Sequence, residues 1–554
     1  MKRCALLLLT FVLFAWTTFA DDKSHQHESP VGLGVVHFPI SCDASVQKSF
    51  ERGIALLHSF WYEEAQREFE QIAESDPKCA MAHWGVAMSL WHQIWDEPSP
   101  ATIKRGQMEM EKALSLSPST PREQGYISAL SAFYGRDEKT YEQRVSGYSA
   151  AMEHLYQRFP ADHEAGAFYA LSLLSTDAHS LRAIALLEKI FGEEPQHPGI
   201  AHYLIHACDS PELAQRGLPA AQQYAKIAPE SPHALHMPSH IFVRLGLWNE
   251  DIHSNIEAIA AAQKGIDRHM GGEFDQLHAM DFLVYAYLQS GREAEVQTVI
   301  ETVRNMPARK DDYGPARLFV LSALPVSSAL ELHHWSEAAS LQTVPDASPG
   351  MQAITYIAKA IGAARSGNLN QARDNLDQLR AIVRGLAESD KEVSGAVERE
   401  LQITVPWIEH LEGRDEDALR LLRSLADKET GISEANQAIP PREMLGDMLL
   451  ELKRPEESLA EYAAELKTNP NRFNSLYGAA RAAELAGQKD KARRYYAALV
   501  ANCRGSNSER PELMHAKEAL RSEPTSKLTS RRASLADDWR NLAISLKIPR
   551  QGFE

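Results

Sequence analysis

The hydrophobic and polar positions follow a helical period along almost the whole chain. From about Cys42 onward no stretch shows a convincing strand-like alternation, and turn signals return at intervals of about fifteen to twenty residues. This pattern predicts an all-α protein. Because 554 residues are too many for one ordinary compact core, we expect either several domains or a repeat array that grows without a single core.

Small, aromatic and proline residues return at corresponding positions along the chain. Near the N-terminus these positions hold Gly53, Ala65, Phe69 and Pro77. Near the C-terminus they hold Ser458, Tyr462 and Pro470. Ala492 and Tyr496 follow 34 residues after Ser458 and Tyr462. This pattern and period resemble the tetratricopeptide repeat, whose two helices pack through small residues. The resemblance extends from about residue 45 to residue 502.

The resemblance implies a right-handed superhelical solenoid of degenerate helix-turn-helix repeats. Each repeat contributes an amphipathic helical pair that cannot bury its apolar face alone, so neighbouring repeats stack and leave a concave groove lined by the first helix of each pair. Arrays of this kind usually work by recognition, and the expected partner is a protein or peptide segment in the groove.

The N-terminus resembles a cleavable export signal. Lys2 and Arg3 precede an apolar run, and Thr18-Phe19-Ala20 is a small-x-small cleavage site, so we expect cleavage near Ala20 and a periplasmic or secreted protein. The predicted organisation is a signal peptide over 1–20, a flexible leader over 21–41, an N-terminal array over 42–310, a C-terminal array over 311–502, and a polar segment with a capping helix over 503–554.

The net charge of the chain restricts its expected partners. The chain carries 58 Lys and Arg against 75 Asp and Glu, a formal net charge of -17, which argues against nucleic acid or an anionic membrane as partners. No membrane span is expected after signal cleavage.

The cysteines left after cleavage are too few for a cysteine scaffold; Cys42 and Cys79 could join the first helices, but the sequence leaves the pairing open.

Histidines are concentrated between residues 202 and 285. His202 and His206 are four residues apart, as are His236 and His240, and this spacing places each pair on one face of a helix. Repeat registers anchored on Ala220, Gly246 and Gly291 direct the whole set into one concave surface. The predicted groove residues are His202, His206, Asp209, His233, His236, His240, His278, Asp281 and Tyr285. Pro238 interrupts the middle helix, and the sequence leaves open whether His233 and His236 line up with His240.

These residues support two kinds of function. The first is an exported binding scaffold whose groove accepts a protein segment or small ligand, with or without a bound metal, and without catalysis. The second is a metal-dependent hydrolase with Asp209 or Asp281 as the base. The candidate metal ligands are His202, His206, His236, His240 and His278, and the candidate cofactors are zinc, copper, iron or manganese ions.

Overall fold

The computed structural model describes residues 32–95, 97–135, 138–307, 314–428 and 439–521. The predicted signal peptide and the helix predicted near the C-terminus lie outside these residues. The predicted division between the arrays at residues 310 and 311 also falls outside them. These domain boundaries therefore stay predictions.

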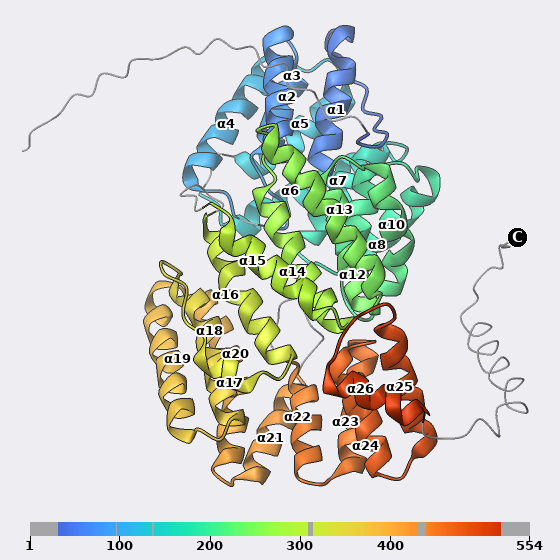
Figure 1. Ribbon diagram of the computed structural model, residues 1–554. Coiled ribbons are helices and arrows are strands. Elements are labelled where there is room, and N and C mark those ends of the chain that lie inside the picture. Colours follow the sequence, from blue (N-terminus) through green and yellow to red (C-terminus); the bar gives the residue numbers. More distant parts are fainter. Residues whose placement is uncertain (1–31, 96, 136–137, 308–313, 429–438, 522–554) are drawn as a thin grey trace, which may run out of the picture.

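Within the described ranges every regular element is a helix, which confirms the all-α class (Figure 1). No helix there is long and apolar enough to cross a membrane. The first elements are η1 (Ala44–Val46), α1 (Gln47–His58), α2 (Tyr62–Ser75), α3 (Ala80–Ser89), α4 (Pro100–Ser115), α5 (Pro121–Tyr134), α6 (Tyr141–Arg158), α7 (His163–Leu174) and α8 (Leu181–Glu193). The middle elements are α9 (Pro198–Ala207), α10 (Ala214–Ile227), α11 (Pro232–His236), α12 (Pro238–Leu245), α13 (Trp248–Asp267), α14 (Glu273–Gln289), α15 (Glu293–Asn305) and α16 (Gly314–Glu331). The last elements are α17 (Trp335–Ser340), α18 (Pro349–Arg365), α19 (Leu369–Ser389), α20 (Lys391–Leu411), α21 (Asp415–Ala426), α22 (Pro441–Glu451), α23 (Pro455–Thr468), α24 (Phe473–Leu485), α25 (Lys489–Asn502) and α26 (Pro511–Arg521).

Aromatic residues inserted between glycines explain the repeated sequence pattern. The ring of Phe69 on α2 lies against both Gly53 on α1 and Gly85 on α3, so closely that a Cβ at either glycine would meet the ring at less than 3.0 Å. Tyr462 on α23 contacts Gly446 and Gly478 in the same way. One aromatic side chain thus fills the space between a helix pair and the next helix, which is the packing expected of the helical repeat that the sequence predicts.

The array curls so that its last helices contact its middle helices (Figure 1). Gly246, at the end of α12, has a φ of 62° and lies against Pro470, with no room for a Cβ. The Asn471 side-chain amide donates to the Gly246 carbonyl at 3.1 Å, and the Trp248 indole donates to the Asn471 carbonyl at 2.9 Å. The C-terminal repeats therefore support the helices that carry the histidines.

Residues 32–41 belong to the packed structure rather than to a flexible leader. Phe38 is fully buried among the rings of Phe50, Trp84 and Tyr126. The backbone and hydroxyl of Ser41 donate to the Glu123 carboxylate at 2.7 and 2.6 Å. The sequence missed this packing because the segment has no helical period.

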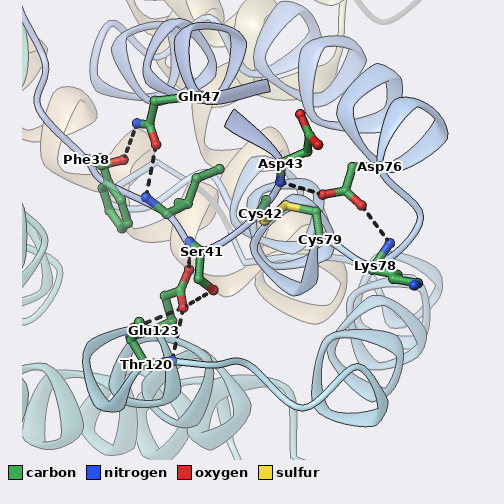
Figure 2. Close-up of a disulfide and its surroundings, with 11 residues drawn as sticks. Phe38, Ser41, Cys42, Asp43, Gln47, Asp76, Lys78, Cys79, Thr120 and Glu123 are labelled. Carbon is green, nitrogen blue, oxygen red and sulfur yellow. Dashed lines mark hydrogen bonds between the residues drawn. A yellow bond between two sulfur atoms is a disulfide. The ribbon is translucent and has the colours of Figure 1, made fainter. Parts of the chain in front are cut away.

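A disulfide fixes the start of the array. Cys42 and Cys79 are bonded across 37 residues and join the segment before α1 to the start of α3 (Figure 2). The backbone N–H of Asp43 donates to the Asp76 carboxylate beside it at 2.8 Å. The other two cysteines among the described residues, Cys208 and Cys503, are free and buried.

Replacing both Cys42 and Cys79 by serine is expected to lower the free energy of unfolding by about 2 to 4 kcal/mol, because the unfolded chain regains the entropy of an open loop. Urea denaturation of the oxidised protein and the variant measures the difference. Reductant should destabilise the parent and leave the variant unchanged. Equal stability of the parent and the variant would contradict the prediction.

Candidate metal centre

Six histidines from neighbouring helices form two groups of three. We call His202, His206 and His233 the first triad, and His236, His240 and His278 the second triad. In each triad the three candidate ligand atoms lie within 4.8 Å of one another. Helix α9 supplies two members of the first triad and α14 supplies one member of the second; α11 and α12 supply the remaining three.

The first triad converges on the Nε2 atom of His202. This atom lies 3.0 Å from Nε2 of His206 and 3.0 Å from Nε2 of His233. His202 is completely buried, and its Nδ1 donates to the backbone carbonyl of His58 at 2.6 Å. Since a carbonyl can only accept, the proton of a neutral His202 is on Nδ1, and its Nε2 presents a bare lone pair to the other two rings.

The second triad is built around one close pair of histidines. The Nε2 atoms of His236 and His240 are 3.1 Å apart. His236 Nδ1 lies 2.7 Å from Oδ1 of Asn255, whose amide nitrogen donates to the carbonyl and carboxylate of Asp251. This orientation of the amide makes His236 Nδ1 the donor and leaves its Nε2 unprotonated. His278 completes the triad from α14.

Acidic side chains hold the outer edges of the imidazoles. His240 Nδ1 donates to Oδ2 of Asp209 at 2.9 Å, and Arg244 Nε donates to Oδ1 at 2.7 Å. Burial opposes ionisation of Asp209, but the hydrogen bond from His240 and the charge and hydrogen bond of Arg244 outweigh it and lower its pKa to about 2. Asp275 lies 3.6 Å from Nδ1 of His233. Such outer partners fix a histidine tautomer with Nε2 free to bind a metal.

Burial favours the neutral form of four of the six imidazoles. Desolvation, with the mutual repulsion of neighbouring histidines, lowers the pKa of His202, His206 and His236 well below 6.5, and lowers that of His278 to about 3. A neutral imidazole is the form that binds transition metals. The two triads are also neighbours, since the ring centroids of His206 and His240 are 6.3 Å apart and those of His233 and His236 are 6.5 Å apart.

The helix break at Pro238 divides the histidines between the triads. Helix α11 ends at His236, and α12 begins at Pro238. His233, on the first turn, joins the pair on α9, whereas His236 and His240 face each other across the break. His233 was predicted as a groove residue but not as a metal ligand, and the structure places it in the first triad.

The three other predicted groove residues lie outside both triads. Asp209 holds His240 and Arg244 through its two oxygens. Asp281 is buried on α14. Tyr285, further along α14, accepts a hydrogen bond at 2.8 Å from Arg472 of the C-terminal repeats.

A buried network behind the first triad had no signal in the sequence. The Glu164 carboxylate lies 2.8 Å from Nε2 of His58 and 3.0 Å from Nε2 of His197. His58 Nδ1 lies 2.8 Å from the Tyr203 hydroxyl, and His197 Nδ1 accepts from the backbone N–H of Ile200. Every ring nitrogen here has a protein partner, so this network supports the His58 carbonyl that orients His202.

Asp209→Asn is expected to weaken metal binding at the second triad by about 10- to 100-fold, because an amide removes the charge that holds the His240 N–H. Competition with a chelator of known affinity measures the change. Asp377→Asn is the matched control, since Asp377 is 70% exposed on α19. An Asp209→Asn affinity equal to that of the control would contradict the assigned role.

Comparisons with known proteins give a likeness of fold alone. No protein-family model and no curated protein matches the chain. Among solved structures it is similar to the APC/C hetero-tetramer Cut9-Hcn1, with 12% identity, a TM-score of 0.28, and coverage of 76% of this chain and 87% of that chain. Naa15/Naa10 bound to HypK-THB has 13% identity and a TM-score of 0.21, with coverage of 82% of this chain and 70% of that chain. The P58(IPK) TPR domain has 13% identity and a TM-score of 0.20, with coverage of 87% of this chain and 100% of that chain. At these TM-scores the likenesses carry no argument about function.

Proposed function

We propose that this protein is a metalloprotein whose helical repeats hold two transition-metal ions, one in each histidine triad. The observation that carries the proposal is the surroundings of His202 Nε2. Its single lone pair faces two other imidazole nitrogens at 3.0 Å, although one lone pair accepts only one well-aligned hydrogen bond. A metal ion accepts all three lone pairs at once.

The spacing of the nitrogens agrees with such an ion. Zinc binds imidazole nitrogen at about 2.0 to 2.1 Å, so two ligands of a tetrahedral ion lie about 3.3 Å apart. The Nε2 separations of 3.0 and 3.1 Å are close to this value. Three protein ligands leave a fourth position for an exogenous ligand, as in catalytic metal sites.

The chemistry of the ligands favours zinc or copper among the predicted metals. Both triads consist of imidazoles, and the nearby carboxylates of Asp209 and Asp275 lie on Nδ1 atoms instead of pointing into the triads. Imidazole suits zinc and copper, whereas manganese prefers oxygen ligands. The ring centroids of Phe60 and Phe282 lie within 5.8 Å of those of triad histidines and provide an apolar surrounding.

The burial of the triads supports metal binding over direct contact with a protein segment. His202, His233 and His236 are only 0%, 7% and 1% exposed. An imidazole at that depth cannot contact a peptide lying in an open groove. Recognition of a protein partner elsewhere on the array stays a prediction from the repeat class.

The hydrolase alternative has less support. It needs a carboxylate that can take a proton from metal-bound water. Asp209, one of the two predicted bases, already accepts hydrogen bonds from His240 and Arg244. This arrangement favours a role in orienting His240.

Calorimetric titration of the metal-free protein with zinc tests the proposal. We expect saturation at two ions per chain. Titration of the His202→Ala variant should saturate at one ion. Absence of binding to the parent protein at micromolar zinc would overturn the proposal.

Acid is expected to destabilise the metal-free protein. Burial lowers the pKa of both His278 and His333 to about 3, whereas a histidine in the unfolded chain titrates near about 6.5. Between these values the unfolded state binds more protons, so the free energy of unfolding falls as pH falls. We expect a loss of about 1 to 2 kcal/mol for each such histidine between pH values of about 7 and 5. Urea denaturation at both pH values measures it, and unchanged stability would contradict it.

A further inference from the structure

A cavity of about 120 Å³ lies beside the first triad. It is bounded by the turn between α1 and α2, by the segment after α3, and by the loop before α14. His233 is the member of the triads that lines it. The other side chains that matter to the argument are Phe60, Trp95, Phe274, Glu63 and Asp275.

Aromatic rings form much of the cavity wall, and Trp95 stands at a steep angle to two of them. The ring of Trp95 is nearly perpendicular to that of Phe60, with centroids 5.2 Å apart, and to that of His233, at 5.4 Å. Phe274 lies 6.3 Å from Trp95. Trp95 is 44% exposed, which is a large fraction for a tryptophan, and it forms the outer wall. Perpendicular walls offer both ring faces and ring edges to a flat ligand.

Phe60 lies between the cavity and the other two histidines of the first triad. Its ring centroid is 4.3 Å from that of His202, and it stacks on His206 and His233 at 5.7 and 5.8 Å. Its φ of 54° is unusual for a bulky residue, and such backbone strain is found mainly where a side chain must be held in one place. The next residue, Trp61, helps to fix the turn by donating to the Met270 carbonyl at 3.1 Å.

Size and charge restrict what the cavity can hold. An apolar protein cavity of about 150 Å³ binds benzene, so the volume suits a single six-membered ring. Carboxylates of Glu63 and Asp275 on the lining disfavour an anion. We propose that this cavity binds a small planar aromatic molecule without negative charge, packed against Trp95 and Phe60; phenol is the probe. That such a molecule is the ligand or substrate of the first triad rests on the proposed metal function, whereas its binding to the cavity does not.

The inference is tested by calorimetry, in which phenol is titrated into the protein as purified. The metal content of the same protein is measured separately. Phenol should bind at least about tenfold more tightly than cyclohexanol, which is not planar, and than benzoate, which is an anion. Trp95→Ala should raise the Kd for phenol about three- to tenfold, and Trp95→Phe should restore most of the affinity. Leu485→Ala, at a residue 54% exposed on α24, is the control and should leave the Kd unchanged.

Equal affinity for phenol and cyclohexanol, or an unchanged Kd in Trp95→Ala, would overturn the inference. Circular dichroism shows whether each Trp95 variant is folded. If Trp95→Ala does not fold, the affinity of Trp95→Phe for phenol still tests the inference. Phenol binding by protein that holds no metal would uphold the cavity and refute the metal proposal. Two bound ions without phenol binding would support the metal proposal and refute the proposed ligand of the cavity.

Discussion

The His236→Ala variant is expected to bind one transition-metal ion per chain where the parent binds two. His236 is 1% exposed, and its Nδ1 is held by Asn255, so its Nε2 can only point toward His240 and His278. Without it the second triad keeps two ligands, and its affinity should fall by more than about 100-fold, beyond the loss seen when only an outer partner is removed. The first triad keeps all three of its ligands.

Metal analysis after dialysis against a weak chelator measures this loss. His253→Ala is the matched control, because His253 is 75% exposed on α13 and belongs to neither triad. The control should retain two ions. Two ions in His236→Ala would contradict the assignment of His236 as a ligand.

Arg472→Met is expected to lower the free energy of unfolding by about 3 to 5 kcal/mol, the typical cost of removing one partner of a buried ion pair. Arg472 is completely buried, and its guanidinium donates to Glu443 of α22, Glu331 of α16 and the Tyr285 hydroxyl of α14. Methionine would leave two buried carboxylates without their cation.

Urea denaturation measures the effect of Arg472→Met. Arg420→Met provides the comparison, since Arg420 pairs with Asp417 on the same helix and is 76% exposed; it should cost less than about 1 kcal/mol. A loss below that value for Arg472→Met would show that the network does not hold the last repeats to the middle ones. Because α14 carries both Tyr285 and His278, metal affinity at the second triad should also fall in this variant.

The helical repeat was predictable because its signal is local. Glycine and aromatic residues recur at a fixed spacing, and the packing of Phe69 between Gly53 and Gly85 is the contact that requires this spacing. The two histidine pairs were predictable for the same reason, since residues four apart on a helix share a face. In the structure the Nε2 atoms of both pairs do face each other, at 3.0 and 3.1 Å.

The rest of the site depends on contacts between distant parts of the chain. The carbonyl that orients His202 belongs to His58, which is 144 residues earlier, and the ring that covers the first triad belongs to Phe60. The direction of His233 depends on the break at Pro238. Tyr285 satisfied the groove pattern but interacts with Arg472, because the array curls and brings the C-terminal repeats against α14.

The central claim is that each chain holds two metal ions in the histidine triads. Metal analysis by mass spectrometry of protein purified without an affinity tag tests it most directly, with melting temperature measured before and after chelation. We predict two equivalents of zinc or copper per chain and a lower melting temperature once the metal is removed, since an ion bound only by the folded state stabilises it. No stoichiometric metal, together with a melting temperature that chelation leaves unchanged, would contradict the account.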